Sequence, residues 1–500
     1  MNLFPFPTSS SPSKTKTQQQ YNMPNHDQDQ LDPIPQAPEP KARPVGATEY
    51  SWCRSVPLGT GITVLALLLS KQPNIHLLQT TLDKLQNSRP LLRTKLRFNS
   101  AANTFSFITP PAAHVRIQPL DLSSTADIIS NSDQNIDPYH VILEHELNKN
   151  SWSTYLDQSS DAETSVFFIT LYTLSENRWA VVLRLHTSTC DRAAAVGLLR
   201  ELLVLMGGEN QGGIAEEYEN EVEVSLGIED YIPRGKGNKP FWARGIDMLG
   251  YSLNSFRLSN LDFVDADSPR GSRVARLQLD SDDTQKLLDG CISRGIKLSG
   301  ALAAAGLIAA QSTKDLPDHQ TEKYAVVTLV DCRSILDPVL CRDHIGFYHS
   351  AIINTHDVSG GEMLWDLAKR CYMSYTNAKN NNKHFTDMGD LNFLMCKAIE
   401  NPGLTPSSSM RTAFISVFED PVMDDSNEMH EKVGVEDYVG CSSVHGVGPS
   451  VAIFDTIRDG RLDCACVYPS PLHSRDQMQK LIDDMKRILV DGCGSVECES

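Results

Sequence analysis

The pattern of apolar and polar positions predicts strands and helices in the first half of the chain. Two segments have apolar residues at helical spacing, and Arg89-Pro90 ends the second because proline cannot continue a helix. Two later apolar runs, joined by the polar turn 175–178, predict a pair of strands. The predicted elements are helices over 64–70, 77–85 and 192–206, and strands over 91–98, 166–174 and 179–185.

The second half begins after residues 207–271, a mostly irregular stretch that is too long for a simple loop. The small residues at 299–311 predict a helix that packs closely against its neighbours. Asp459-Gly460 predicts a type I′ hairpin between the last two strands. The predicted elements are strands over 273–279, 324–330, 349–355, 412–418, 451–457 and 461–468, and helices over 282–294, 299–311 and 478–489.

The predicted elements indicate a mixed α/β protein, and the length of the chain predicts that it has two parts. A chain of 500 residues exceeds what one core usually organises, and 40% of it is hydrophobic. Residues 1–45 are rich in Pro, Ser, Gln and Asn, so they predict a disordered tail, which we favour over a transit peptide because the opening segment lacks arginine. We expect an N-terminal subdomain over 46–206, a crossover linker over 207–271 and a C-terminal subdomain over 272–492.

Charge and cysteine usage narrow the class of protein. The chain has 63 acidic and 45 basic residues, a net charge of -18 that disfavours nucleic acid or an anionic membrane as partner. The longest apolar run, 61–69, is far shorter than the roughly 20 residues of a membrane span. The 12 cysteines form no CxxC pair, and no early apolar segment is typical of a signal peptide. We therefore expect a cytoplasmic protein with reduced thiols.

The sequence contains few motifs with known chemistry. The sequence has no phosphate-binding P-loop, no GxGxxG after a strand, no HExxH and no GxSxG. His344, His349 and His356 lie near Cys332 and Cys341, but their spacing fits no metal-ligand pattern. We expect no metal.

His186 and Asp191 form the candidate site, because they lie between a predicted strand and the helix over 192–206. An imidazole titrates near neutral pH, so His186 could act as a general base. Asp191 could orient it, form an ion pair with an arginine, or cap the following helix. Spacing alone favours the capping role.

Several segments in order resemble the chloramphenicol acetyltransferase-like superfamily, which includes condensation domains, alcohol acetyltransferases and BAHD-type acyltransferases. The closest likeness is to plant condensation-domain-containing proteins, and it covers about residues 50–489. It implies two chloramphenicol-acetyltransferase-like subdomains with a channel between them, and a monomer. The matching segments are LQNSRPLLRTKLRF, LRLHTSTCDRAAAVGLLREL, SGALAAAGLIAA, VDCRSILDP, HIGFYHSAI, GVGPSVAIF and GRLDCACVYP.

The catalytic motif of the superfamily is HHxxxDG, whose second histidine is the general base and whose aspartate is structural. This chain has HTSTCDR, so Thr187 occupies the position of the catalytic histidine and Arg192 that of the glycine. The closing BAHD motif DFGWG is absent. Threonine is not basic near neutrality, and alternation along a strand predicts that His186 points away from Thr187.

Three interpretations of function remain open. The first is an acyltransferase that moves an acyl group from a thioester, with acyl-CoA as co-substrate, to a small-molecule hydroxyl or amine acceptor. Its base would be His186 or a relocated His349 or His445. The second is a catalytically inactive module that binds a ligand or a protein. The third is a different reaction, with Thr187 and Cys190 as polar lining.

The resemblance also implies a buried ion pair between Asp191 and an arginine. The candidates are Arg89, Arg93 and Arg333. Cations that could hold the phosphates of acyl-CoA are Lys297, Arg333, Arg342 and Arg458, although solvated surface residues are the usual identity of such groups. We assign no cofactor-binding residue.

Overall fold

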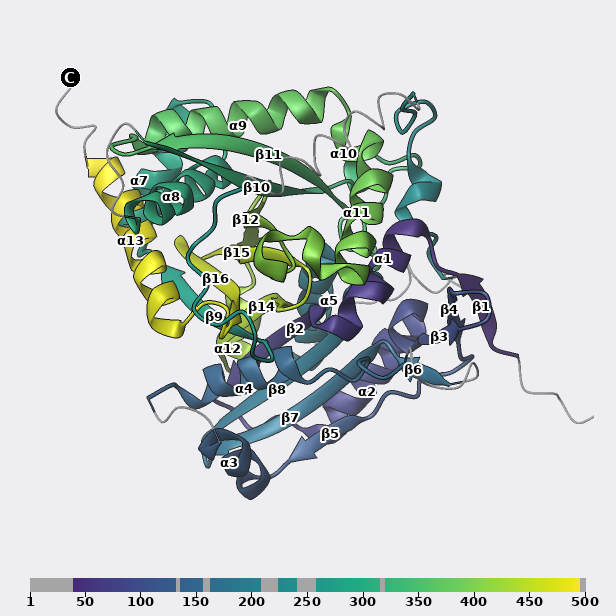
Figure 1. Ribbon diagram of the computed structural model, residues 1–500. Helices are drawn as coiled ribbons and strands as arrows, with labels where there is room; N and C mark the ends of the chain where they lie inside the picture. The colour runs from purple at the N-terminus through teal and green to yellow at the C-terminus, as the bar shows by residue number, and fades with distance from the viewer. Residues whose placement is uncertain are drawn as a thin grey trace, which may run out of the picture. The chain divides into compact units, whose positions relative to one another are not determined.

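In the described part of this computed structural model, apolar strands build three β-sheets, and helices cover them (Figure 1). The fold is mixed α/β, as the sequence predicts. The structure describes residues 39–131, 135–155, 162–207, 224–240, 258–314 and 320–494.

The five-stranded sheet combines strands from both halves of the sequence, in the order β14-β2-β8-β7-β5. The late strand β14 pairs antiparallel with β2, and β7 and β8 form the predicted hairpin. The bounds are β2 (Thr60–Leu69), β5 (Ile117–Leu120), β7 (Phe167–Ser175), β8 (Arg178–His186) and β14 (Val435–Val444).

The helix predicted over 64–70 is wrong, because this segment belongs to β2. All ten residues of β2 are buried. A strand buried on both faces is apolar at every position, so its pattern cannot be told from that of a buried helix. Pairing with β8 on one side and β14 on the other gives the strand its backbone partners.

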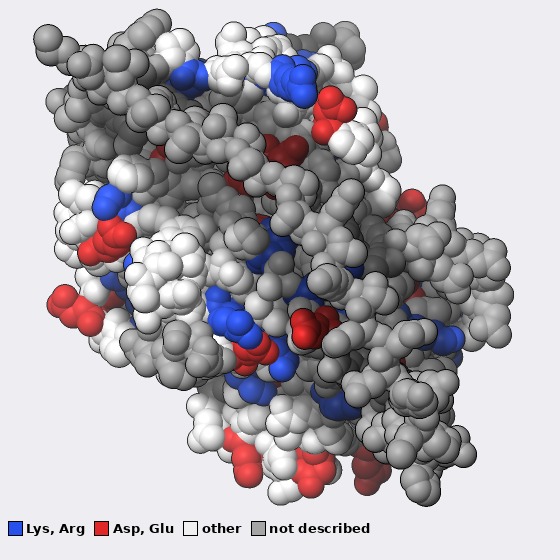
Figure 2. All heavy atoms as spheres, turned by 90° about the vertical axis from the view of Figure 1, so that its right-hand side faces the viewer, with Lys and Arg blue, Asp and Glu red and all other residues white. Residues whose placement is uncertain are grey.

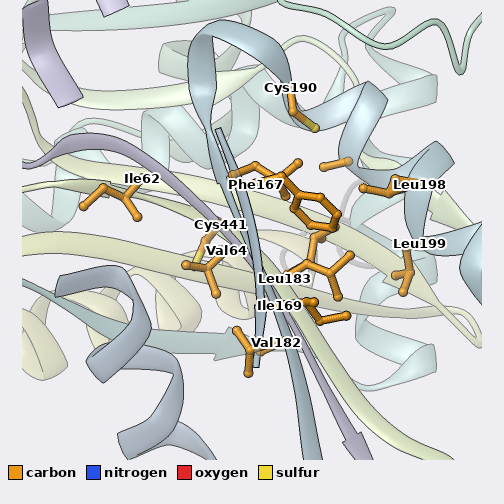
Figure 3. Close-up of a cluster of buried hydrophobic side chains, with 14 of the residues drawn as sticks. Ile62, Val64, Phe167, Ile169, Val182, Leu183, Cys190, Leu198, Leu199 and Cys441 are labelled. Atoms are coloured by element: carbon orange, nitrogen blue, oxygen red, sulfur yellow. The ribbon is translucent and has the colours of Figure 1, made fainter. Parts of the chain in front are cut away.

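Helix α5 (Arg192–Met206) has the bounds that the sequence predicts and packs on one face of the five-stranded sheet. Figure 3 shows Phe167 and Ile169 on the same side of the sheet as Leu198 and Leu199 of α5. Val64 lies on the opposite side in the same view. The two faces of the sheet are therefore occupied by alternate residues along each strand.

The seven-stranded sheet follows the order β11-β10-β12-β15-β16-β9, and β13 pairs with β15. Asp459 and Gly460 both have positive φ, at 53° and 71°, as a type I′ hairpin requires. The strands are β9 (Gly271–Gln278), β10 (Thr321–Asp331), β11 (His349–Ser359), β12 (Arg411–Phe418), β13 (Val422–Asp424), β15 (Gly448–Arg458) and β16 (Arg461–Ser470). The helices in contact with this sheet include α7 (Ser281–Ser293), α8 (Leu298–Ser312), α9 (Leu364–Asn380) and α13 (Arg475–Gly494).

A four-stranded sheet contains the earliest described strand, in the order β1-β4-β3-β6. Most of the predicted tail, residues 1–38, lies outside the described residues, but 41–44 form a strand, so regular structure begins earlier than predicted. The strand predicted over 91–98 is a 3-10 turn at Pro90–Arg93 followed by β3, because proline favours the first turn of a helix. The strands are β1 (Lys41–Pro44), β3 (Lys95–Asn99), β4 (Thr104–Thr109) and β6 (Glu163–Ser165).

Within the described residues, the other helices of eight or more residues are α1 (Ala47–Ser55), α2 (Ile75–Ser88), α3 (Leu122–Ser130), α4 (Pro138–Asn148) and α11 (Met388–Glu400). Two shorter ones are α10 (Lys383–Thr386) and α12 (Asn427–Val433). The predicted linker falls partly outside the described residues, at 208–223 and 241–257. The subdomain boundaries stay predictions.

No single helix in the described ranges is long and apolar enough to cross a membrane; only α7 and α8 together meet the length and composition, with a bend of 106°. On the face drawn in Figure 2, described Lys and Arg side chains lie close to Asp and Glu side chains.

Candidate active site

A cavity of about 630 Å³ takes its walls from the five-stranded and the seven-stranded sheets. Apolar side chains such as Trp52, Leu65 and Phe418 make up much of the wall. Thr187, Asp191 and His349 are among its polar members. Thr187 and Asp191 of the motif, together with His349, therefore meet a large, mainly apolar space, which is typical of a small-molecule site.

Asp191 is a buried carboxylate that holds two parts of the chain together. It caps α5 by accepting a hydrogen bond from the Ala194 amide at 2.9 Å. The Arg333 guanidinium donates to both of its oxygens, each at 3.0 Å. The Tyr348 amide donates to Oδ2 at 2.7 Å. The capping role and the ion pair, considered separately in the sequence, are present together.

Arg333 is the partner of Asp191 among the three arginines considered. Arg89 pairs instead with Glu201 at 3.0 Å, and Arg93 donates to backbone carbonyls. Burial by itself would raise the pKa of Asp191, but the charge and the hydrogen bonds of Arg333 hold that pKa well below its usual range. Asp191 is therefore ionised at neutral pH.

His349, the first residue of β11, lies in the cavity wall beside Asp191. Its Nδ1 is 2.9 Å from Asp191 Oδ2, and its ring meets Phe418 edge-on, with centroids 5.7 Å apart. An ionised carboxylate at this distance favours the tautomer with the proton on Nδ1. In the neutral ring of that tautomer, Nε2 has the lone pair that a general base requires.

His186 points away from the cavity, in line with the predicted alternation. It is fully buried, and its Nδ1 accepts hydrogen bonds from the Ser188 amide at 3.2 Å and hydroxyl at 2.7 Å. Its ring packs edge-on against Trp152. Burial lowers the pKa of His186 to about 3, so the ring is neutral. It forms hydrogen bonds within the loop and does not face the cavity.

Thr187, at the position of the superfamily's catalytic histidine, is in the cavity wall but uses its hydroxyl on the protein. Oγ1 donates to the Gly61 carbonyl at 2.6 Å. Thr63 Oγ1 lies 2.7 Å from Thr187 Oγ1 and 2.8 Å from Ser442 Oγ. Because a hydroxyl has one proton, Thr63 donates to Thr187, and this chain of hydroxyls ties β14, β2 and the end of β8 together.

Arg192 makes a contact that the sequence did not predict. Its Nη1 is 2.9 Å from Asp455 Oδ1, and its guanidinium lies 4.1 Å from the centroid of the Phe418 ring. An ion pair thus joins α5 to β15 in the cavity wall, where the superfamily motif has a glycine. The arginine in that motif position was the one signal in the sequence.

Cys190 and His445 are outside the cavity wall. Cys190 is buried, and burial raises the pKa of its thiol. His445 Nδ1 lies 3.0 Å from Ser272 Oγ, and burial lowers the pKa of its ring to about 4. Neither residue meets the cavity, so His349 is the member of the three histidines considered that does.

Three of the four cations considered for phosphate binding pair with acidic side chains, Arg333 among them. Within the part of the chain that the structure describes, no three His, Cys, Asp or Glu residues come together as metal ligands. Lys297 pairs with Glu419 and Asp420, and Arg458 pairs with Asp437. Arg342 is exposed.

No protein-family model matches this sequence, and no curated protein sequence does. Solved structures do match over most of the chain. A trichothecene 15-O-acetyltransferase from Fusarium sporotrichioides is 13% identical, with a TM-score of 0.65, over 93% of this chain and 100% of that chain.

Two further structures extend the likeness. Polyketide synthase associated protein 5 from Mycobacterium tuberculosis is 15% identical, with a TM-score of 0.62, over 91% of this chain and 98% of that chain. The cyclization-docking bidomain of the EpoB peptide synthetase from Sorangium cellulosum is 13% identical, with a TM-score of 0.61, over 90% of this chain and 85% of that chain. The chain therefore has the two-lobed mixed α/β fold of condensation domains and chloramphenicol acetyltransferase-like acyltransferases.

Proposed function

We propose that the protein is an acyltransferase that moves an acyl group from acyl-CoA to the hydroxyl or amine of a small-molecule acceptor, with His349 as general base. One observation carries the proposal: His349 lies in the cavity wall with Nδ1 at 2.9 Å from Asp191 Oδ2. The fold supports the reaction class, while the assignment of His349 comes from this chain alone.

Each side chain of the site has a part in the reaction. Arg333 keeps Asp191 ionised, and Asp191 holds the Nδ1 proton of His349. Nε2 accepts the proton of the acceptor while the acceptor oxygen or nitrogen bonds to the thioester carbonyl carbon. The tetrahedral intermediate then breaks its carbon–sulfur bond, and the departing thiolate takes the proton from His349.

The test is acyl transfer by the purified protein with a panel of acyl-CoA thioesters and hydroxyl or amine acceptors, followed by thiol release. We expect His349→Gln to lower kcat by about 10²–10⁴, the usual contribution of a general base. His186→Asn is the matched control. It changes a fully buried histidine beside the same loop, keeps an oxygen that Ser188 can donate to, and should leave kcat near the wild-type value.

Two results would contradict the proposal. Equal rates for wild type and His349→Gln would remove His349 from the reaction. Binding of acyl-CoA without thiol release by any pair of substrates would instead support the inactive binding module, in which Thr187 marks a lost catalytic position.

A further inference from the structure

Arg411, the first residue of β12, is a buried cation with an unused donor. Its side chain is 1% exposed and lines the cavity. Nε donates to the Ser409 carbonyl at 3.2 Å, and Nη1 donates to the carbonyls of Val444 and Pro449 at 2.9 Å and 2.6 Å. Nη2 is buried and has no hydrogen-bond partner. A buried donor without a partner costs free energy, so it marks a place where a ligand can bind.

Thr60, the first residue of β2, supplies a second unused polar group nearby. Its side chain lines the same cavity, is 6% exposed, and leaves Oγ1 without a partner. Thr60 of β2 lies opposite Val444 of β14, and the Val444 carbonyl accepts a hydrogen bond from Arg411. Thr60 also lies next to Gly448 of β15, the strand partner of Arg411. Val444 and Gly448 thus place Thr60 and Arg411, with their unused hydroxyl and guanidinium N–H, in the same part of the cavity wall.

The charge around Arg411 is positive. No acidic side chain forms an ion pair with it within the described residues, and Arg270 donates to the same Ser409 carbonyl. Burial, and then the charge of Arg270, lower the pKa of Arg411 to about 9. A buried charge without an ion-pair partner is unfavourable. A bound anion would therefore supply the opposite charge that Arg411 lacks within the protein.

This site lies away from His349. Arg411 begins β12 and Phe418 ends it, a separation of about 23 Å along an extended strand. Phe418 is the residue whose ring meets His349. The mainly apolar cavity therefore has a cation at one end of β12 and the proposed base at the other.

We propose that Arg411 and Thr60 bind the carboxylate of a long, mainly apolar ligand. The identity of this ligand rests on the proposed function: it is the acyl acceptor, and its hydroxyl or amine lies at His349. A single guanidinium edge and one hydroxyl match a monoanionic carboxylate. The phosphates of a coenzyme carry more charge and usually meet several cations, so they suit this site less well.

Calorimetric titration of the full chain with ω-hydroxydodecanoate and its primary amide tests the proposal, because the two probes differ in charge and share their shape. We expect the carboxylate to bind at least tenfold more tightly than the amide. Thr60→Val should reduce that ratio about tenfold, as loss of a hydrogen bond to a charged group predicts. Arg411→Lys should also reduce it, since lysine lacks the forked donors.

Thr456→Val is the matched control, because Thr456 lines the cavity near the opposite end of β15 from Gly448. It should leave the ratio unchanged. If Arg411→Lys does not fold, Thr60→Val decides by itself. Equal affinity for the two probes, no saturable binding, or a ratio that Thr60→Val leaves intact would overturn the carboxylate site. These titrations contain no thioester, so failure of acyl transfer would leave their result standing.

Discussion

At the scale of single residues, Asp191 connects stability to the candidate chemistry. It accepts hydrogen bonds from Arg333, Ala194 and Tyr348 and also contacts His349. A carboxylate buried with this many donors has been removed from water and depends on all of them. The residue that positions the proposed base is therefore also a structural residue, and activity and folding have to be measured separately.

We expect Asp191→Ala to lower the free energy of unfolding by about 3–5 kcal/mol, because it leaves the Arg333 charge buried without its main partner. Urea unfolding followed by circular dichroism measures this. Asp331→Ala is the control: Asp331 also contacts Arg333 at 3.0 Å, but its side chain is 37% exposed, so we expect a loss below about 1 kcal/mol. Similar losses in the two variants would contradict the buried ion pair.

At the scale of elements, the small residues of α8 allow close approach on two sides. A Cβ on Gly300 would lie 2.9 Å from the carbonyl oxygen of Ala368 in α9. A Cβ on Gly306 would lie 2.6 Å from Cδ1 of Ile415, the flexible end of a side chain. Backbone cannot move aside as readily as a methyl group, so the two glycines differ in what they tolerate.

We therefore predict that the same substitution is more harmful at Gly300 than at Gly306 of α8. Gly300→Ala should destabilise the protein by about 1–3 kcal/mol through overpacking against α9. Gly306→Ala should stay within about 1 kcal/mol of wild type, because helix propensity offsets a small movement of Ile415. The midpoints of urea unfolding give both values, and a more harmful Gly306→Ala would show that the Ile415 side chain cannot adjust.

The success of the sequence predictions also varies by element. The helix over 192–206 and the hairpin at Asp459-Gly460 were predicted correctly because each carries a strong local signal. β2 was predicted in part as a helix because burial on both faces removes its alternation. β14 was missed because it has a mixed sequence, VEDYVGCSSV, and depends on its antiparallel pairing with β2.

At the scale of the whole molecule, burial of histidines makes the folded state sensitive to acid. Burial lowers the pKa of His186 to about 3. It also lowers the pKa of five other histidines to about 4. These are His344, His356, His384, His445 and His473. The unfolded chain, with an ordinary histidine pKa near 6.5, takes up protons that the folded protein does not.

The sign of the pH dependence follows from these depressed values. The free energy of unfolding should fall as pH decreases from about 6.5 towards 4, by up to about 1.4 kcal/mol per pH unit for each such histidine. Urea unfolding at a series of pH values measures the slope. His186→Asn should reduce the slope by the contribution of one histidine. A free energy of unfolding that stays constant from pH 7 to pH 5 would contradict the buried neutral histidines.

The sequence by itself determined the α/β class, elements with a strong local signal such as α5 and the β15–β16 hairpin, and the direction of His186 away from Thr187. These follow from backbone periodicity and turn chemistry, which act over a few residues, whereas the place of Thr187 at the base position came from the resemblance. The tertiary structure alone decided that His349 meets Asp191, that Arg333 pairs with a residue 142 positions away, and that Arg411 keeps a donor free. Such contacts depend on how distant strands pack together, and no local pattern of apolar and polar residues encodes that packing.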